Sequence, residues 1–593
     1  MSKQDKVILG LHYGHDATVV LIKNGVVLEA MSEERLSRQK KHCGFPILAL
    51  DYLKKKYGIN TFPNVIVVGS MLEFGSDVFN TTEDMKNFRA ANLKTKWYLR
   101  SVGFRFPVVG ALIRFRDEFI HRKARKVSTK TKVLEFLNSM LPGSKLTFIH
   151  HHDAHAWASV LFMSDHGKKL IFTLDGAGDD ASGSVSIYEK GKLEVLKRFN
   201  ISDSLGLLYC AFVDILGMTR NEHEFKVMGL APYAKASSGE NVYQELRNIF
   251  SFDEKEMKFI SKIDTTKATA YLLAKEFNIK YRFDSMAYGI QKLTEEMMKQ
   301  LVSSYVKKYN IHSIAAGGGV FMNVKANQKI LELDLVNDFT ITPSCGDESL
   351  AVGAAVYGYI KEYGYQDLKQ VNNIYWGSEY SNEDIKKVID FYIWSDNNKG
   401  KVKVEYFARL KGDVIETKIA ELLSNNKVIG RMYGRAEWGA RALGNRSILA
   451  NPSNRDNVKL INEMIKNRDF WMPFATSLKE ERKKDYIVDK VDAEAPYMAI
   501  TFDTTALAHK DLPAALHPYD LTSRPQVVSK ASNPEYWNLI TEFEKITGIG
   551  GVLNTSFNLH GEPNIENPYD AVRTFDLSGM NYLALGDYLL SKE

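Results

Sequence analysis

One unusual pattern occurs twice in this chain, and it constrains the fold more than any other feature of the sequence. Residues 7–30 read VILGLHYGHDATVVLIKNGVVLEA, which predicts a strand, a polar turn, a second strand, a hairpin at Asn24–Gly25 and a third strand. Residues 169–198 read KLIFTLDGAGDDASGSVSIYEKGKLEVLKR and predict the same order of elements. The repeat indicates a duplicated α/β fold whose two polar turns face one cleft, although two hairpin pairs can also resemble each other by chance.

The length of the chain and a change of pattern predict two domains. With 593 residues the chain is long enough for at least two. Near residues 365–375 the pattern changes, and YWGSEYSNEDIKKVI predicts a newly capped helix. We therefore predict one domain over residues 1–373 and a second over residues 374–593.

Cysteine usage and hydropathy point to a compartment. The three cysteines are widely separated, which excludes a disulfide framework and a cysteine-rich zinc site. The N-terminus lacks the apolar core of a signal peptide, and no apolar run is long enough to cross a membrane. These features predict a cytoplasmic protein without a transmembrane segment.

Positive charge is concentrated in one segment. Residues 86–132 contain 14 Lys and Arg but only two acidic residues, Asp117 and Glu118, although the net charge of the chain is only +6. A solvated basic insert explains this pattern. A docking face for an acidic acceptor, a nucleic acid or an anionic membrane explains it as well.

Four of the 14 histidines fall within HHHDAH at 150–155. If this stretch is helical, His151 and His155 lie one turn apart on the same face, where two imidazoles can bind one metal ion. The alternative is a pair of capping or buried core histidines, which is the more common role at this spacing. We expect His150 to act as a spacer or cap and His152 to lie near the ligand.

Two aspartates at strand ends can complete a metal site. Asp175 ends the predicted strand LIFTLD, and Asp347 lies in the glycine turn SCGDES. Two imidazoles with one or two carboxylates suit Fe(II), Mn(II) or Zn(II). Each aspartate also has an alternative role, because Asp175 can cap its own turn and Asp347 can cap the following helix.

Glycine-rich turns indicate anion binding in both predicted domains. Gly317–Gly318–Gly319 precedes a helix that begins near Asn323, and such a turn can bring backbone N–H groups against a phosphate or nucleoside. In the second domain, glycines alternate with basic residues, which suits a phosphate pocket better than a nucleic-acid surface. These basic residues are Arg431, Arg435, Arg441, Arg446, Arg455, Lys466 and Arg468. LNTSFN at 553–558 predicts a ligand-binding loop, or a turn that satisfies its own hydrogen bonds.

Ten motifs run in order along the chain. They are GLHYGHDAT (10–18), SEERLSRQKKHCGFP (32–46), HHDAHA (151–156), LDGAGDD (174–180), EFKVMGLAPYA (224–234), GGGVFMN (317–323), GDESLAVGAA (346–355), GRAEWGARALGNRSILANP (434–452), IKNRDFWMPFA (465–475) and NTSFNLHGEPN (554–564). Several are weak alone, but together they are specific. The set resembles the O-carbamoyltransferase family that includes the nodulation and antibiotic-biosynthesis carbamoyltransferases.

The resemblance implies a fold and a reaction. The first domain is expected to be similar to the universal tRNA threonylcarbamoyl-transfer protein, an actin-like, duplicated α/β ATPase fold. The second is expected to have the α+β fold of YrdC/Sua5-like proteins. In such enzymes carbamoyl phosphate and ATP, with Mg(II), form carbamoyl adenylate in the second domain. In the first domain a hydroxyl of a small-molecule, sugar, glycan or natural-product acceptor attacks the carbamoyl carbon, and AMP leaves.

The resemblance also assigns residues to roles. His151, His155, Asp175 and Asp347 match the family's metal positions, and ferrous iron is the expected metal. His15 is expected to act as a general base or to position the carbamoyl group, so that His15, His151, His155 and Asp175 form the catalytic set. The residues expected to bind the adenylate are Asp16, Lys226, Gly317, Gly318, Gly319 and Asn323. Those expected to bind carbamoyl phosphate and ATP are Arg441, Arg446, Lys466, Arg468, Arg524, Ser556 and Asn558.

Three positions in the second domain depart from the family pattern. Met472 stands where the family usually has an arginine, so one phosphate contact is missing or is supplied from elsewhere. Ala440 replaces a proline, which changes the stiffness of a loop and not its charge. Asn564–Ile565 replaces the usual Ile–Val after GEP.

The sequence leaves alternative functions open. The same donor motifs would serve a transferase that carbamoylates an amine or guanidine. The basic segment supports a tRNA-modifying threonylcarbamoyl transferase, but the presence of both domains in one chain argues against it, and we do not expect a nucleic-acid partner. A non-catalytic nucleotide switch on an actin-like fold is a third alternative. The acceptor, the metal and the oligomeric state, including a homodimer, are left open.

Overall fold

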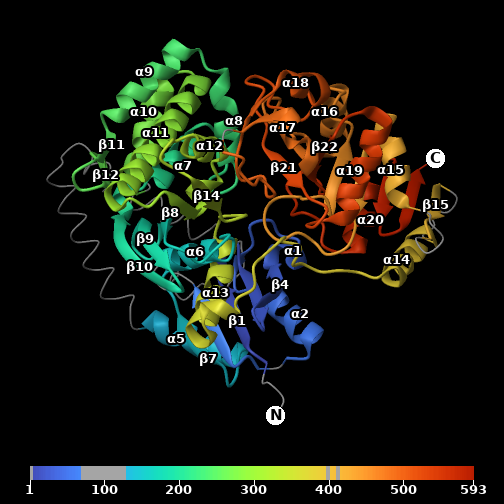
Figure 1. The fold of residues 1–593 in the computed structure, drawn as a ribbon, viewed down its shortest axis with the longest axis horizontal. Helices are drawn as coiled ribbons and strands as arrows, with labels where there is room; N and C mark the ends of the chain where they lie inside the picture. The colour runs from blue at the N-terminus through green and yellow to red at the C-terminus, as the bar shows by residue number, and fades with distance from the viewer. Residues whose placement is uncertain are drawn as a thin grey trace. The chain divides into compact units, whose positions relative to one another are not determined.

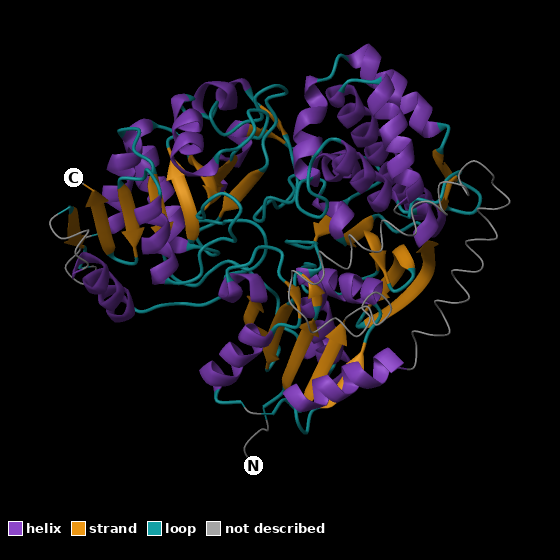
Figure 2. Cartoon of the chain, turned by 180° about the vertical axis from the view of Figure 1, so that it is seen from behind, coloured by secondary structure: helices purple, strands orange, loops and turns teal. Residues whose placement is uncertain are grey.

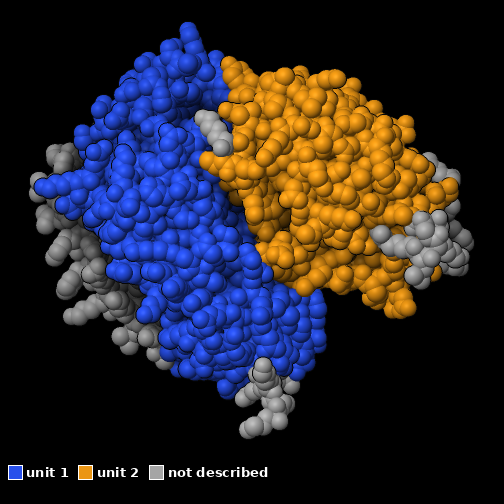
Figure 3. All heavy atoms as spheres, in the orientation of Figure 1, with its two compact units in different colours: residues 1–33, 41–370 blue, residues 34–40, 371–593 orange. Residues whose placement is uncertain are grey.

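The computed structural model describes residues 5–59, 61–68, 128–266, 268–394, 401–408, 414–489 and 491–592. The chain divides into two compact units, shown in Figure 3: unit 1 comprises residues 1–33 and 41–370, and unit 2 comprises residues 34–40 and 371–593. Residues 86–127, most of the basic segment at 86–132, lie outside the described residues. Among the described helices, none is both long and apolar enough to span a membrane.

Unit 1 contains two five-stranded sheets with the same strand order (Figures 1 and 2). The first consists of β1 (Val7–His12), β3 (Thr18–Lys23), β4 (Val26–Ser32), β6 (Asn64–Val68) and β7 (Lys145–Phe148), in the order β4-β3-β1-β6-β7. The second consists of β8 (Lys169–Gly178), β9 (Ala181–Glu189), β10 (Lys192–Asn200), β13 (Ser313–Gly317) and β14 (Asp338–Ile341), in the order β10-β9-β8-β13-β14.

The directions of the strands repeat as well as their order. In each sheet the first three strands form an antiparallel meander, and the last two run parallel to the first strand. This repetition confirms the predicted duplicated, actin-like α/β fold.

Both predicted hairpins adopt the conformation of a tight two-residue turn. Asn24 and Gly25 have φ values of 51° and 82°, and Lys190 and Gly191 have 47° and 79°. Positive φ at both central residues is the type I′ geometry, whose twist matches that of the flanking antiparallel strands. Each hairpin signal in the sequence thus corresponds to one specific backbone conformation.

A helix follows the last strand of each sheet. Helix α6 (His151–Val160) follows β7, and α13 (Glu348–Tyr363) follows β14. A Cβ at Gly353 would lie 1.7 Å from the carbonyl oxygen of Ala154, and a Cβ at Gly10 would lie 2.0 Å from that of Ala351. Only glycine permits this approach of backbones, so α13 packs tightly against both α6 and β1.

The rest of unit 1 is mainly helical. Helix α11 (Phe283–Tyr309) packs against its helical neighbours (Figure 1). These neighbours and the connecting hairpin are α7 (Leu205–Ile215), α8 (Glu224–Leu230), α9 (Ala236–Arg247), α10 (Ala268–Lys280), α12 (Val324–Leu331), β11 (Phe250–Asp253) and β12 (Lys258–Ser261). Unit 1 also contains β2 (Gly14–His15), β5 (Cys43–Gly44), α2 (Ile47–Tyr57) and α5 (Ser128–Met140). Helix α1 (Glu33–Ser37) begins at the last residue before the segment 34–40 of unit 2.

Unit 2 is built on one eight-stranded mixed sheet, which makes it an α+β unit. The sheet has the order β15-β24-β23-β16-β17-β22-β18-β21 and includes parallel and antiparallel pairs. Its strands are β15 (Val402–Tyr406), β16 (Ile429–Met432), β17 (Arg446–Ala450), β18 (Ala475–Lys479), β21 (Pro525–Val528), β22 (Gly551–Ser556), β23 (Tyr582–Leu585) and β24 (Tyr588–Lys592). Its longer helices are α14 (Asn382–Trp394), α15 (Ile415–Ser424), α19 (Pro534–Thr547) and α20 (Pro568–Leu577).

Candidate functional site

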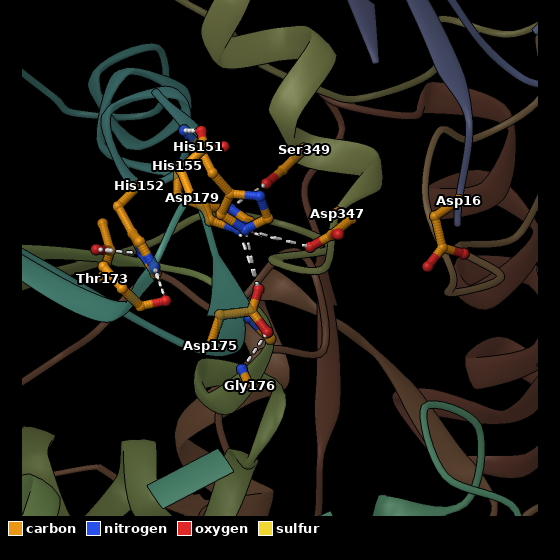
Figure 4. A network of polar contacts seen from close by, with 12 residues as sticks. Asp16, His151, His152, His155, Thr173, Asp175, Gly176, Asp179, Asp347 and Ser349 are labelled. Carbon is orange, nitrogen blue, oxygen red and sulfur yellow. Dashed lines mark hydrogen bonds and ion pairs between the residues drawn. The ribbon is translucent and has the colours of Figure 1, made fainter. Parts of the chain in front are cut away.

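The candidate site in unit 1 is built at the N-terminus of α6. His150 precedes the helix in an extended conformation, and its Nδ1 accepts a hydrogen bond from the N–H of His152 at 3.2 Å. Asp179 accepts another from the N–H of His151 at 2.8 Å. These bonds satisfy N–H groups that lack a partner inside the helix. His151 and His155, one turn apart, therefore present their rings to the same place (Figure 4).

Two imidazoles and two carboxylates converge at this helix end. The Nε2 atoms of His151 and His155 are 3.1 Å apart, and Asp175 Oδ2 lies 3.1 Å from His155 Nε2. Asp347 Oδ1 lies 3.7 Å from each Nε2. One ligand atom of each residue lies within 4.8 Å of the other three. The structure thus brings together, from α6, the end of β8 and the start of α13, the four residues assigned by the resemblance to a metal.

Neighbouring groups orient these side chains. Asp175 accepts hydrogen bonds from the N–H of Gly176 at 2.5 Å and from that of Gly319 at 3.3 Å. His155 Nδ1 bonds to Ser349 Oγ at 3.1 Å, which leaves its Nε2 to face the cluster. At metal sites, hydrogen bonds of this kind fix the tautomer of a histidine ligand and the orientation of the ligand side chains.

Glycines pack directly against the cluster. A Cβ at Gly178 would lie 2.2 Å from Cγ of His151, and a Cβ at Gly317 would lie 2.9 Å from the carbonyl oxygen of His155. Gly318 has a φ of 93°, which disfavours other residues, and a Cβ there would overlap the backbone of β8. The glycine run at 317–319 therefore supports the cluster through close packing, and one of its N–H groups is already used by Asp175.

The donor set fits a divalent metal ion. Although burial disfavours the charged form, Asp175 and Asp347 raise the pKa of His155 to about 9. Burial alone would raise the pKa of both aspartates. The imidazoles of His151 and His155 nevertheless hold the pKa of Asp175 well below its ordinary value, and His15 and His151 lower the pKa of Asp347. Two nitrogen and two carboxylate ligands suit Fe(II), Mn(II) or Zn(II), and a tetrahedron with bonds of about 2.1 Å has edges of about 3.4 Å, close to the distances above.

His15 links the first polar turn to this cluster. Its Nε2 lies 3.1 Å from Asp347 Oδ2, and its Nδ1 lies 3.1 Å from Asp16 Oδ2. Lys41 Nζ donates a hydrogen bond to the same oxygen of Asp16 at 3.0 Å. The charge of Asp347 raises the pKa of His15 to about 10 although burial opposes it, and Asp16 adds to the effect. With Asp175 at the second turn, both polar turns of the repeat reach the cluster.

The other two histidines of HHHDAH are structural. His152 is fully buried, its Nδ1 lies 3.2 Å from Thr173 Oγ1 and its Nε2 lies 3.1 Å from the carbonyl oxygen of Ala181. Burial holds the pKa of His152 well below its ordinary value, so it stays neutral. Both ring nitrogens of His152 therefore contact protein groups, and the expectation that His152 lies near the ligand is not supported. His150 is the N-cap of α6, as expected for a capping residue.

Two further residues expected to bind the adenylate lie on separate helices of unit 1. Asn323 is the N-cap of α12, where its side chain accepts a hydrogen bond from the N–H of Ala326 at 3.1 Å and exchanges two with Gln291. Lys226 lies half-buried on α8. Neither residue is a member of the four-residue cluster.

Unit 2 contains an arginine-lined pocket with about 320 Å³ of empty space, part of it open to solvent. Its lining residues are Ala440, Arg441, Ala442, Arg468, Ala475, Met498, Arg524, Asn554, Thr555 and Ser556. Three arginines are among these lining residues, and none of the described residues that line the pocket is acidic. A pocket of this size and charge can hold a phosphate-bearing ligand. We refer to it below as the arginine pocket.

The charges in the arginine pocket repel one another. Arg524 makes no hydrogen bond or ion pair with any residue in the described ranges; burial, Arg441 and Arg468 hold its pKa well below its ordinary value. Burial and Arg441 lower the pKa of Arg468 to about 10. Arg468 donates to Thr555 Oγ1 at 3.1 Å, which fixes the direction of its guanidinium. A bound anion would offset this repulsion, so the pocket is prepared for negative charge.

Lys466 lies behind the pocket wall and is enclosed by oxygens. Its Nζ donates to Ser556 Oγ at 3.1 Å, to Asn558 Oδ1 at 2.8 Å and to the carbonyl oxygens of both residues. Burial, with the charges of Arg468 and Lys40, lowers the pKa of Lys466 well below its ordinary value. Because these oxygens already surround it, Lys466 holds the 556–558 loop in place.

Arg446 is not part of the arginine pocket. It is fully buried at the start of β17, and its guanidinium donates to the backbone carbonyls of Tyr433, Gly434, Asn445 and Ser378 at 3.0–3.1 Å. A guanidinium held by four carbonyls stabilises the loop at 433–446. The structure therefore separates Arg446 from Arg441, Arg468 and Arg524.

Two more arginines from the glycine-rich segment also serve the fold. Arg431 is buried between the rings of Tyr433 and Tyr536, with its guanidinium carbon 5.0 and 5.5 Å from their centroids. Arg435 donates to the carbonyl oxygens of Trp376 and Gly377. Fewer arginines therefore line the pocket than the number in this segment of the sequence suggests.

Several residues of these sites carry no individual signal in the sequence. Lys41 lies within the motif at 32–46 and reaches Asp16, and Asp179 caps α6 from the second polar turn. Glu348, directly after Asp347, is buried, and burial together with Asp16 raises its pKa to about 7. Two acidic residues in sequence, at a glycine turn, are the signal that would have pointed to Glu348.

Comparison with known proteins gives a consistent result over nearly the whole chain. A family model described as "Carbamoyltransferase N-terminus" matches residues 7–356, and one described as "Carbamoyltransferase C-terminus" matches residues 420–592. An uncharacterized protein of Methanocaldococcus jannaschii is 31% identical over 99% of this chain and 100% of its own length. Nodulation protein NolNO of Sinorhizobium fredii is 28% identical over 98% of this chain and 79% of its own.

Among solved structures, full-length HypF is similar with a TM-score of 0.32 and 12% identity, over 61% of this chain and 56% of that one. The N-terminal family model alone covers more than half of the chain, and the two models together confirm the resemblance carried by the ten motifs. The chain belongs to the carbamoyltransferase family of enzymes.

Proposed function

We propose that the protein is an ATP-dependent O-carbamoyltransferase that divides its reaction between the two units. Unit 2 would make carbamoyl adenylate from carbamoyl phosphate and ATP, and unit 1 would transfer the carbamoyl group to a hydroxyl of a small-molecule, sugar, glycan or natural-product acceptor. The observation that carries this proposal is the contrast between the sites. One offers imidazoles and carboxylates around a metal-sized centre, and the other is lined by three arginines and, among the residues that the structure describes, by no carboxylate.

The arginine pocket suits the first half of the reaction. Carbamoyl phosphate and the triphosphate of ATP, with Mg(II), are highly charged, and three guanidinium groups can bind their oxygens in a bidentate manner. Forming carbamoyl adenylate consumes one water molecule: water cleaves carbamoyl phosphate to carbamate and phosphate, and a carbamate oxygen attacks the α-phosphorus of ATP while pyrophosphate leaves. Negative charge therefore builds up on the leaving phosphate groups. Arg441, Arg468 and Arg524 are positioned to stabilise that charge, and Ser556 and Thr555 can add neutral hydrogen bonds.

The four-residue cluster suits the second half of the reaction. His151, His155, Asp175 and Asp347 would hold a divalent metal ion, for which ferrous iron is the expectation. When bound, the metal supplies positive charge that orients the adenylate phosphate and offsets charge on the departing AMP. The chain itself would exclude water through buried His155 and Asp347, and it keeps His155 and Asp175 oriented through Ser349, Gly176 and Gly319.

His15 would act next to the cluster on the carbamoyl group. Each of its ring nitrogens lies 3.1 Å from a carboxylate oxygen, Nδ1 from Asp16 Oδ2 and Nε2 from Asp347 Oδ2, so both nitrogens are placed to donate a hydrogen bond to a carboxylate. A protonated imidazole donates hydrogen bonds and cannot accept a proton. Of the two roles expected from the sequence, we therefore favour positioning of the carbamoyl oxygen over general-base catalysis.

Product analysis tests the proposal directly. Purified protein is incubated with ATP, Mg(II) and Fe(II), with and without carbamoyl phosphate, and pyrophosphate and AMP are quantified. We expect pyrophosphate only when carbamoyl phosphate is present, and a carbamoylated product when extracts with hydroxyl-bearing acceptors are added. Nucleotide turnover that ignores carbamoyl phosphate would contradict the proposal.

A further inference from the structure

The segment at residues 34–44, here called the strap, belongs to both units. Residues 34–40 cluster with unit 2, whereas Glu33 and Lys41 on either side of them cluster with unit 1. The strap lies inside one of the family motifs, yet neither proposed half-reaction uses it. One part of it contacts two loops of unit 2, one of which precedes the lining of the arginine pocket, and the other part contacts the turn of unit 1 that carries His15.

In unit 2, two arginines of the strap hold two loops by their carbonyl oxygens, and one of these loops leads directly into the arginine pocket. Arg35 is buried and donates to the carbonyl oxygens of Gly439 and Ile565, both at 3.1 Å. Gly439 directly precedes Ala440 and Arg441, which line the arginine pocket. A movement of Arg441 toward a bound anion would therefore pull on a carbonyl that Arg35 holds.

Arg38 holds a second loop of unit 2. It donates to the carbonyl oxygen of Asn564 at 2.7 Å and to that of Pro563 at 3.0 Å, and it lies 3.4 Å from Asp570. This loop continues to Asn558, whose side chain bonds to the carbonyl oxygen of Glu562 at 2.8 Å and which is one of the groups that enclose Lys466. Lys40, at the end of this part of the strap, is close enough to affect the titration of Lys466.

In unit 1, the next residues of the strap hold the His15 turn. Strand β5 (Cys43–Gly44) pairs with β2 (Gly14–His15), and the N–H of Asp16 donates to the carbonyl oxygen of His42 at 3.0 Å. Lys41 pairs with Asp16, which in turn contacts His15. Lys40 and Lys41 are thus consecutive residues that cluster with different units, and Lys41 pairs with the turn that carries His15.

The backbone of the strap is strained where the two parts meet. Arg38 and Lys41 have φ values of 58° and 56°, in the left-handed region that residues other than glycine rarely adopt. Such a conformation persists only when contacts on both sides maintain it. The strap is therefore held by its anchors, and the loss of one anchor allows it to relax.

We propose that the strap is a positioning element through which occupancy of the arginine pocket controls the placement of His15. When an anion binds and Arg441 moves toward it, the loops that Arg35 and Arg38 hold become more ordered. Because Lys40 is bonded to Lys41, this ordering extends along the strap to Asp16 and His15. His15 is then fixed for carbamoyl transfer only when the donor site is loaded. This inference rests on the proposed function, because it requires the arginine pocket to bind phosphate groups.

Amide hydrogen exchange with inorganic pyrophosphate as the probe tests the coupling without an activity assay. In the full-length wild-type protein, saturating pyrophosphate should slow exchange about threefold or more in peptides covering the pocket loops at 439–444 and 553–558, and also in peptides covering residues 13–17 and 34–44. In Arg38→Ala the pocket loops should still be protected, but residues 13–17 should no longer respond. A two-glycine insertion between Lys40 and Lys41, which leaves every side chain in place, should have the same effect.

Arg573→Ala is the matched control. Arg573 pairs with Glu562 in the loop that Arg38 holds, but it is not part of the strap, so the response at residues 13–17 should persist. Protection of the pocket without any response at residues 13–17 in the wild type would overturn the coupling, and so would a response that survives both strap variants. Absence of protection in the pocket loops themselves would instead overturn the anion pocket of the proposed function, and the coupling with it.

Discussion

At Gly178, the last residue of β8, the backbone comes so close to His151 that only a hydrogen atom fits as the side chain. We expect Gly178→Ala to displace the imidazole, because the added Cβ would lie 2.2 Å from its ring. Substitution of a residue that holds a metal ligand in its orientation typically weakens metal binding about 10- to 100-fold. Fe(II) titration of the variant measures this loss. Gly176→Ala is the control, since its Cβ would meet only Leu207 at an ordinary 3.5 Å; equal losses in both variants would contradict the assignment.

His155 makes metal binding at the cluster depend on pH. Asp175 and Asp347 overcome the effect of burial and raise its pKa to about 9, so at pH 7 a proton occupies the imidazole that must face the metal. Metal binding then releases this proton, and affinity should rise about tenfold per pH unit from pH 6 toward pH 9. Titrations of the metal-free protein with Fe(II) or Zn(II) at several pH values measure this slope. A constant affinity over that range would be the contrary result.

Two arginines of unit 2 should respond to substitution in opposite ways. Arg524 has no protein partner in the described part of the chain, so Arg524→Ala should weaken pyrophosphate binding about 10- to 100-fold and leave stability unchanged or higher. Arg446 satisfies four buried carbonyls, so Arg446→Ala should lower the free energy of unfolding by about 3–5 kcal/mol. Calorimetric binding and denaturant unfolding of both variants distinguish the roles. An Arg446→Ala protein of wild-type stability would refute the structural role.

Among the helices and strands, those with a regular spacing of apolar residues or a typical turn sequence can be predicted from the sequence. The two meanders, their Asn–Gly and Lys–Gly turns and the long helix at 283–309 follow from alternation, turn chemistry and helical spacing. The i, i+4 spacing of His151 and His155 gave one half of the candidate cluster. Asp175 and Asp347 could be added because polar residues at strand ends of an α/β fold meet at one edge.

Other features could not be predicted because they depend on contacts between distant segments. Asp179 and Asp175 are close in sequence, but only the fold shows that one caps α6 while the other faces the cluster. Arg446 and Arg441 look equivalent in GARALGNR, and only burial separates the structural from the pocket-lining residue. Nothing in the composition of residues 34–40 indicates that they belong with unit 2.

Helix α13 is the element on which the geometry of the cluster most depends. Its N-terminus carries Asp347, and Gly353 sets its distance from α6, because a Cβ there would lie 1.7 Å from the carbonyl oxygen of Ala154. Gly353→Ala should therefore lower the free energy of unfolding by about 2–4 kcal/mol and weaken metal binding together. Thermal unfolding and metal titration measure both. Lys361→Ala, on the exposed side of the same helix, should change neither, and a stable Gly353→Ala protein with full metal affinity would contradict this view.

At the scale of the whole molecule, the chain contains two units with sites of opposite chemical character. Unit 1 gathers its cluster from both halves of the duplicated fold, since His151 and His155 come from the first half and Asp175 and Asp347 from the second. Unit 2 supplies the basic pocket on its mixed sheet. The proposed reaction in two steps would explain why one chain keeps both sites, because the first step would use arginines and the second a metal ion held by imidazoles and carboxylates.

The His155→Ala variant tests this division most directly. Carbamoyl-phosphate-dependent formation of pyrophosphate from ATP is measured together with carbamoylation of an acceptor, in protein whose folding is checked by circular dichroism. If the two steps occur in separate units, His155→Ala forms pyrophosphate within about twofold of the wild-type rate while carbamoylated acceptor is no longer detected. Loss of pyrophosphate formation in the folded variant, or acceptor carbamoylation at the wild-type rate, would contradict the account.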